Sequence, residues 1–220
     1  MLPIYLKDLD FTPPEDPIYY LLARDGLFLV KRTAFFEAAV PVQGIPWLRP
    51  QEPGVRLTAP PLPAALLLNA VAFFKAVYGR YQSEAVALLG WREASRAYEL
   101  VIPHQTVVGG HCNYEVREFP EGLIRLGTIH SHAGAQAFHS ERDEADERHE
   151  DGFHLTVGNL DGDLTLACSI VIQGFRGQIP PEALFKPYPI PWEEMPPETD
   201  WDQEVAAKVT PLPRPIEFGT

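Results

Sequence analysis

Two short stretches decide the fold: Gly127-Thr128-Ile129-His130-Ser131-His132 and, after a spacer of seven residues, Ser140-Glu141-Arg142-Asp143. If the first stretch ends a β-strand, alternate side chains share a face, so His130 and His132 point the same way. Two imidazoles and a carboxylate are a typical set of catalytic zinc ligands and leave a fourth tetrahedral position for water. Asp143 offers that carboxylate from the first turn of a following helix.

Each part of this pattern also has a simpler interpretation. A His-x-His pair on a strand is often only polar decoration of a sheet edge. Ser140 and Asp143 have the spacing of a capping box at a helix start. The cap and the metal site are compatible, because a cap would hold Asp143 on the helix face nearest Ser140.

The chain around the motif reads as a mixture of strands and helices. Apolar runs predict roughly five core strands, at 85–89, 98–102, 123–129, 155–158 and 164–172. The best helix is predicted over 62–81, with Pro63 in its first turn. Its apolar arc is wide, which indicates packing on two sides. The acidic segment 141–150 can be helical only as a solvated element.

Both ends of the chain differ in character from this core. Two β-leaning runs around Arg24-Asp25-Gly26 predict a hairpin over 18–40, after an irregular start and before a Pro- and Gly-rich loop at 41–61. Ten of the 23 prolines lie between Pro180 and Pro215. This tail either wraps the core through Phe185, Trp192 and Trp201 or is flexible. We therefore predict an extension at 1–58, a core at 59–178 and a tail at 179–220.

Composition excludes several kinds of partner. The chain has 220 residues, a formal charge of −12 and a pI near 5.0. Such a surface repels phosphate backbones and anionic membranes, so we expect neither nucleic acid nor a membrane as a partner. No apolar run reaches the length of a membrane span, and Met1 to Asp10 lacks the features of a signal peptide. Two cysteines make no disulfide framework. We expect a soluble, reduced, cytoplasmic protein.

The motif resembles the signature of the JAMM, or MPN-plus, zinc metalloproteases, in the bacterial JAB branch of the Mov34/MPN/PAD-1-like proteins. His130, Ser131, His132, Ser140 and Asp143 match it position by position. Glu84, at the start of Ser83-Glu84-Ala85-Val86-Ala87-Leu88-Leu89-Gly90, matches the family's upstream glutamate. The resemblance covers residues 62–175. Ala133 stands where the family usually has proline, and the spacer lacks its common tryptophan; these departures concern substrate contacts more than metal binding.

This resemblance implies an α/β (α+β) fold of the MPN/JAMM type. Its mixed, curved β-sheet would be flanked by helices, with the N-terminal β-hairpin extension and the Pro-rich C-terminal tail outside it. It further implies Zn²⁺ bound by His130, His132 and Asp143, with Glu84 as general base and Ser140 as hydrogen-bond donor to the developing oxyanion.

The family cleaves peptide or isopeptide bonds, typically after the C-terminal glycine of ubiquitin or a ubiquitin-like protein. The implied partners are a ubiquitin-like protein or its conjugate, and activating-enzyme-like proteins encoded nearby. Two alternatives stay open. One is an MPN scaffold that only binds metal or partners. The other is a zinc peptidase acting on small peptide or amino-acid conjugates.

Other chemically capable residues have plainer interpretations. His139, inside the spacer, is expected to be an exposed loop residue. His111 and Cys112 do not form a nucleophilic pair if they lie on a strand, because adjacent side chains then point to opposite faces. Cys168 sits in an apolar run and reads as a small core residue.

Overall fold

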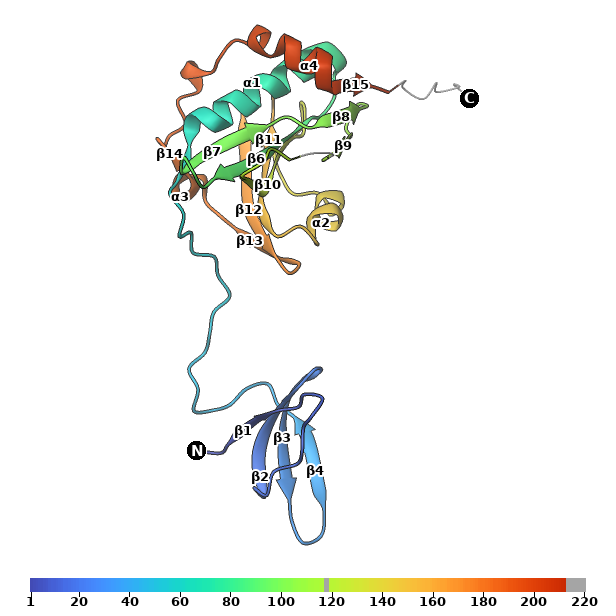
Figure 1. The fold of residues 1–220 in the computed structure, drawn as a ribbon, viewed down its shortest axis with the longest axis vertical. Helices are drawn as coiled ribbons and strands as arrows, with labels where there is room; N and C mark the ends of the chain where they lie inside the picture. Colours follow the sequence, from blue (N-terminus) through green and yellow to red (C-terminus); the bar gives the residue numbers. More distant parts are fainter. Residues whose placement is uncertain (117–118, 213–220) are drawn as a thin grey trace, which may run out of the picture. The chain divides into compact units, whose positions relative to one another are not determined.

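The computed structural model describes residues 1–116 and 119–212. Its contacts divide the chain into two compact units, Met1–Pro53 and Gly54–Thr220. The larger unit contains the candidate site. Its centre is a mixed six-stranded sheet in the order β13-β12-β11-β10-β6-β7 (Figure 1). The strands are β6 (Val86–Arg92), β7 (Ala97–Val101), β10 (Leu123–Ser131), β11 (Gly152–Gly158), β12 (Thr165–Ile172) and β13 (Phe175–Gln178).

The mixed α/β fold predicted from the sequence is confirmed. β10 and β11 are parallel, and the other neighbouring pairs are antiparallel. All five predicted core strands are present. The sixth strand, β13, was not predicted, because its residues Phe-Arg-Gly-Gln form no apolar run.

The register of the central strands separates an apolar face from a polar one. The apolar row runs across four strands through Ala87, Ile129, Leu155 and Cys168. On the other face, Thr128 pairs with His154 and His154 with Ser169, and all three are buried. A buried polar row needs polar partners above it, so this face cannot be covered by an ordinary apolar helix.

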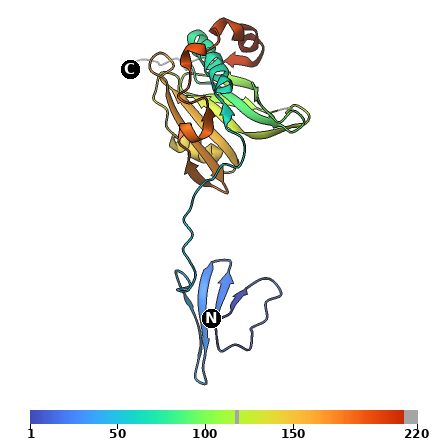
Figure 2. The same cartoon turned by 90° about the vertical axis from the view of Figure 1, so that its left-hand side faces the viewer.

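Helix α1 (Ala64–Tyr81) covers the apolar face, two residues shorter than the predicted helix. Leu62 and Pro63 instead form the short strand β5 (Leu62–Pro63). The prediction that the helix packs on two sides is confirmed. Figures 1 and 2 show the sheet on one side of α1 and the C-terminal segment on the other, where the Phe73 and Trp201 rings meet edge to face at 5.6 Å.

The C-terminal segment wraps the core. Phe185 is fully buried, and Trp192 and Trp201 pack against the main core. Its elements are α3 (Pro181–Leu184), β14 (Phe185–Lys186), the 3₁₀ helices Trp192–Glu194 and Glu198–Trp201, α4 (Asp202–Lys208) and β15 (Val209–Pro211). β14 pairs with β5, and β15 pairs with β8.

A hairpin of β8 (His104–Val107) and β9 (Cys112–Glu115) lies in a stretch for which no strand was predicted. The two strands are short and largely polar, and the four residues between them include Gly109 and Gly110. The sequence therefore gives little indication of β-structure here. β15 extends this hairpin into a three-stranded sheet in the order β15-β8-β9. β9 is therefore an edge strand of the described part of the chain.

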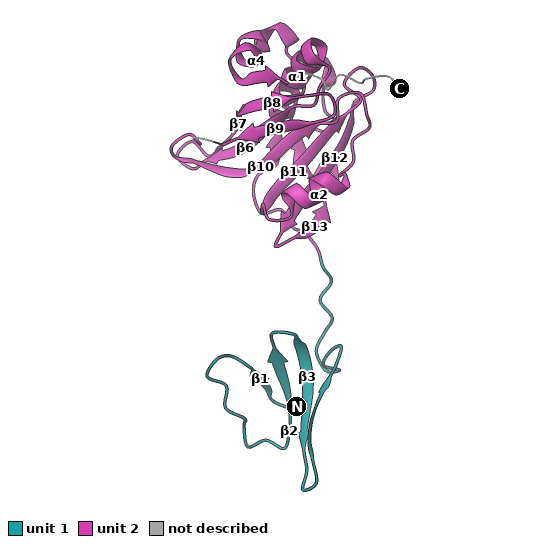
Figure 3. Cartoon of the chain, turned by 90° about the vertical axis from the view of Figure 1, so that its right-hand side faces the viewer, with its two compact units in different colours: residues 1–53 teal, residues 54–220 magenta. Residues whose placement is uncertain are grey.

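The N-terminal unit is a small sheet of four strands, β1-β2-β3-β4 (Figure 3). The predicted hairpin is confirmed as β2 (Ile18–Ala23) and β3 (Gly26–Arg32), joined by the two-residue turn Arg24-Asp25. The chain turns again before β4 (Glu37–Pro41), where the Thr33 hydroxyl accepts backbone N–H groups. β1 (Ile4–Leu6) lies in the start that was expected to be irregular. Among the helices of the described residues, none is long and apolar enough to cross a membrane.

Gly127 sets the register of β10 and gives the first testable prediction. It lies at φ +149°, beside the register shift between Arg125 and Gly127, and a Cβ there would lie 1.8 Å from the Phe153 carbonyl oxygen. Gly127→Ala should therefore destabilise the domain by about 3 kcal/mol or more, from backbone strain plus overpacking.

Denaturant unfolding of the two matched variants measures this effect. Gly162→Ala is the control, because nothing lies within 4 Å of its added Cβ. Equal unfolding midpoints for Gly127→Ala and wild type would contradict the register argument.

Candidate metal centre

β10 delivers both histidines to the polar face of the sheet. His130 is its penultimate residue, and His132 follows the strand end. The backbone N–H of His132 donates to the Val157 carbonyl at 2.8 Å, which keeps the chain aligned with β11 beyond the end of β10. The predicted common orientation of His130 and His132 is therefore present in the structure.

Helix α2 (Glu141–Glu147) supplies the carboxylate through a capping box. The Ser140 N–H donates to Asp143 Oδ2 at 2.7 Å, and the Asp143 N–H donates to Ser140 Oγ at 3.2 Å. These reciprocal bonds satisfy two N–H groups at the helix start and fix the Asp143 carboxylate. The capping function and the delivery of a carboxylate to the histidines thus coexist.

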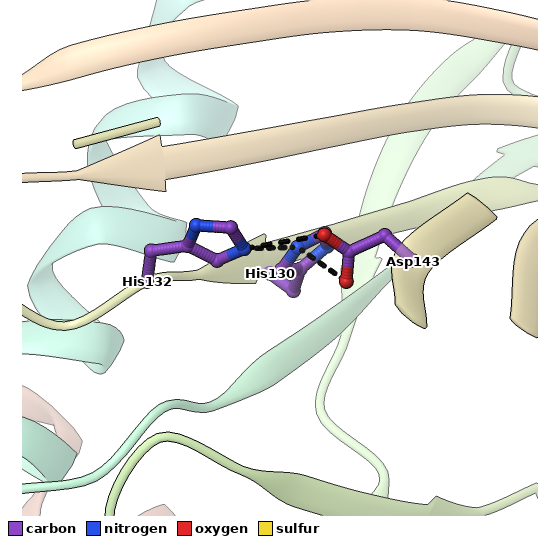
Figure 4. A group of neighbouring side chains, drawn as sticks. All are labelled: His130, His132 and Asp143. Atoms are coloured by element: carbon purple, nitrogen blue, oxygen red, sulfur yellow. Dashed lines mark hydrogen bonds and ion pairs between the residues drawn. The ribbon is translucent and has the colours of Figure 1, made fainter. Parts of the chain in front are cut away.

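The three side chains converge on one small volume (Figure 4). His130 Nε2 and His132 Nε2 are 3.2 Å apart. Asp143 Oδ1 lies 3.5 Å from His130 Nε2, and Asp143 Oδ2 lies 3.3 Å from His132 Nε2. Ligands about 2.0–2.1 Å from a tetrahedral zinc ion lie about 3.3–3.4 Å from one another. The donor set and its spacing therefore fit Zn²⁺.

Electrostatics keep Asp143 in the form that binds metal. Burial favours the neutral acid, but hydrogen bonds from His130 and His132 outweigh it and hold the pKa of Asp143 well below its usual range. For His132, burial opposes protonation, but Asp143 and Glu84 together raise the pKa of its imidazole. A cation is thus favoured at the point where these groups meet.

Glu84 lines the same cavity as the three candidate ligands. It is held from both sides: the Glu84 N–H donates to the Gly109 carbonyl at 3.0 Å, and the next N–H, of Ala85, donates to Ser131 Oγ at 3.0 Å. Burial raises the pKa of the Glu84 carboxyl, and the nearby His132 and His130 partly offset this. The structure therefore brings all five predicted site residues, Glu84, His130, His132, Ser140 and Asp143, to one cavity.

His139 is half-buried rather than exposed, so that expectation was wrong. Thr156 Oγ1 lies 3.4 Å from His139 Nδ1 and 3.3 Å from His130 Nε2. Burial, followed by the charge of Arg176, lowers the pKa of His139 to about 4. The loop is folded back against the start of β12, where the Ala137 N–H donates to Thr165 Oγ1 at 2.8 Å. The spacer, residues 133–139, is mostly small residues without periodicity and gave no signal for this packing.

The expectation that α2 is a solvated helix is confirmed for most of its residues but is wrong for Glu147. Glu147 is 8% exposed, although its neighbours in the acidic run are mostly open to solvent. It lies one helical turn after Asp143, on the same face. That spacing was the signal in the sequence from which its inward orientation could have been inferred.

The segment that contains this cluster is similar to a known protein family. A model of prokaryotic homologues of the JAB domain matches residues 69–169. This segment is therefore similar to prokaryotic JAB domains. The match contains Glu84, His130, His132, Ser140 and Asp143.

Solved structures similar to the chain include JAB domains. A JAB1/MPN domain protein from Archaeoglobus fulgidus is 17% identical, with a TM-score of 0.38, over 56% of this chain and 94% of that one. A structure described as JAMM, a metalloprotease-like zinc site in the proteasome and signalosome, is 18% identical, with a TM-score of 0.35, over 56% and 95%. A protein from Desulfitobacterium hafniense is 14% identical, with a TM-score of 0.33, over 52% and 85%. No protein with a curated description matches the chain.

Cysteine reactivity provides a test of the cavity's electrostatics. Burial, with a contribution from the charge of Glu84, raises the pKa of Cys112 to about 12, and burial raises that of Cys168 to about 12. At pH 8 only about one thiol in ten thousand would be a thiolate. Neither cysteine of the folded protein should react with an aromatic disulfide reagent within minutes, and both should react after unfolding. One rapid equivalent in the folded protein would contradict this assignment.

Proposed function

We propose that the chain is a zinc-dependent peptidase or isopeptidase that hydrolyses an amide bond. The observation that carries this proposal is the convergence of His130, His132 and Asp143 at tetrahedral spacing, in a cavity that also holds Glu84. A scaffold that merely binds a partner has no need for a partly buried carboxylate beside such a cluster. The JAB and JAMM family includes zinc metalloproteases, which is consistent with this assignment.

The chain's own residues divide the reaction between them. His130, His132 and Asp143 would hold Zn²⁺, which when bound supplies a Lewis acid and a water of lowered pKa. Glu84 takes the water proton and passes it to the leaving amine, a role favoured by its partly buried carboxylate. The Ser140 hydroxyl accepts the Asp143 N–H and keeps its own proton to donate to the developing oxyanion.

The edge strand β9 favours an extended polypeptide as substrate. Cys112, Asn113 and Tyr114 line the cavity that contains the metal cluster. An extended segment can add to an edge strand as a further strand. We therefore propose that the C-terminal tail of a ubiquitin-like protein, alone or in a conjugate, lies along β9 with its last peptide group at the cluster.

The setting of the reaction follows from the same proposal. Activating-enzyme-like proteins encoded nearby would make the conjugates that this chain cleaves. A cytoplasmic location is consistent with Cys112 and Cys168, which are both free thiols.

Cleavage of a defined substrate panel tests the function. Zinc-loaded protein is incubated with a ubiquitin-like protein carrying a C-terminal amide-linked reporter and with short peptides ending in the same tail. We expect release of the reporter from the protein substrate. Cleavage of the short peptides alone would support a peptidase of small conjugates. Binding of the protein substrate without any cleavage would support a scaffold and overturn the proposal.

Glu84→Gln separates metal binding from catalysis. The amide keeps the size of the side chain but cannot accept the water proton, so kcat should fall by about 10²–10⁴-fold while zinc content is unchanged. Glu93→Gln is the matched control, because Glu93 is exposed and lies outside the cavity. Cleavage by Glu84→Gln at the wild-type rate would show that another group is the base.

A further inference from the structure

A buried ionic network lies behind the histidine cluster, on the polar face of the sheet. Glu147 Oε2 accepts from Arg176 Nη2 at 2.6 Å, and Arg176 Nε lies 2.7 Å from Glu144 Oε1. The Arg176 side chain is only 7% exposed and the Glu147 side chain 10%. Arg176 also donates to Ser169 Oγ at 2.6 Å. β13 thus holds α2 through charge rather than through apolar contact.

Burying these charges costs free energy, and docking of α2 alone does not explain why a charged side chain is used. Glu147 is the only residue of α2 that is buried. Removing two charges from water costs several kcal/mol per ion, and well-packed apolar residues usually replace such pairs without loss of stability. The buried polar row beneath α2 needs a polar partner, but a neutral side chain such as glutamine would supply one without burying a charge. The identity of the side chain at position 147 therefore needs another explanation.

The Glu147 carboxylate is aimed at the rear nitrogen of a candidate ligand. His130 presents Nε2 to Asp143 and His132, and its other nitrogen, Nδ1, lies 3.8 Å from Glu147 Oε1. A neutral imidazole whose Nε2 lone pair is given to a metal carries its proton on Nδ1. On Nδ1, that proton lies on the side of the ring that faces the buried carboxylate of Glu147.

The position of Glu147 is fixed independently of His130. Its Oε1 lies 3.3 Å from His154 Nδ1. His154 is fully buried, and its Nε2–H donates to the Glu150 carbonyl at 2.8 Å. Arg176 binds the other oxygen and holds the carboxylate against the sheet, with Oε1 beside His154 Nδ1.

We propose that Glu147 is a positioning residue for the metal centre: it accepts the Nδ1–H of His130, fixes the tautomer that offers Nε2 and increases the basicity of that nitrogen. His130 Nδ1 and Glu147 Oε1, 3.8 Å apart, are too distant for a hydrogen bond, and we expect this distance to shorten when His130 binds a metal. A carboxylate behind a ligating histidine acts in this way at zinc sites, and its loss weakens metal affinity by about 10- to 100-fold. The inference rests on the proposed function only in requiring that His130 binds zinc.

The test compares Glu147→Gln with a matched control, Glu144→Gln. Both substitutions remove one negative charge and one contact with Arg176, but Glu144 is half-exposed and only Glu147 approaches His130. Zinc affinity is measured by competition with a chromophoric chelator. We expect about 10- to 100-fold weaker binding for Glu147→Gln and a change of less than about threefold for Glu144→Gln. Glu147→Asp, which keeps the charge, should recover part of the loss.

A spectroscopic readout distinguishes positioning from general stabilisation. In zinc-loaded protein with ¹⁵N-labelled histidine, the Nδ1–H signal of His130 should move upfield in Glu147→Gln and stay unchanged in Glu144→Gln. If Glu147→Gln fails to fold, the double variant Glu147→Gln/Arg176→Gln avoids an unpaired buried cation and serves in its place.

The outcomes separate the two proposals. If wild type binds zinc and the Glu147 variants bind it equally well with the same His130 signal, Glu147 only docks α2, and this inference is overturned while the proposed function stands. If wild type binds no zinc, both proposals fail.

Discussion

The structure depends on the register in which β10 pairs with β6 on one side and β11 on the other. That register places Ile129 on the apolar face beneath α1 and His130 on the opposite face. A shift by one residue would bury His130 among apolar side chains and turn Ile129 towards the cavity. Gly127 marks the point where the pairing shifts, because only a residue without a side chain can approach the Phe153 carbonyl there. The fold and the site are thus specified by the same backbone pairing.

The two faces of the sheet are covered in different ways. α1 covers the apolar face of the sheet by burying large apolar side chains such as Phe73 and Phe74. This burial is favourable and does not depend on direction. α2 is held by its cap at Ser140 and by the ion pairs of Arg176, which are directional. A short helix fixed in this way gives little to global stability, but it orients a carboxylate precisely enough for ligation. Stability and site geometry are therefore supplied by different elements of one domain.

Much of the fold was predictable because its signals are local or periodic. α1 has a wide apolar arc, β6 begins with a continuous apolar run, and β10 and β12 are largely apolar. His130, His132, Ser140 and Asp143 were also predictable, since their spacing encodes both the strand and the cap. Glu84 was indicated only by the resemblance to the JAMM family. β9 and β13 were missed because they are short and polar and pair only in the tertiary structure. The network of Glu147, His154 and Arg176 was missed because its members are far apart in sequence and are brought together only by the packing of α2 on the sheet.

The proposed function and the proposed role of Glu147 both require that His130, His132 and Asp143 bind zinc. The most direct test is the metal content per chain of the purified protein, measured beside Asp143→Ala by elemental analysis after identical zinc loading and desalting. Circular dichroism of both proteins checks that the variant remains folded. We expect about one zinc ion per wild-type chain and much less in the variant. A folded wild-type protein that retains no zinc after loading would contradict it.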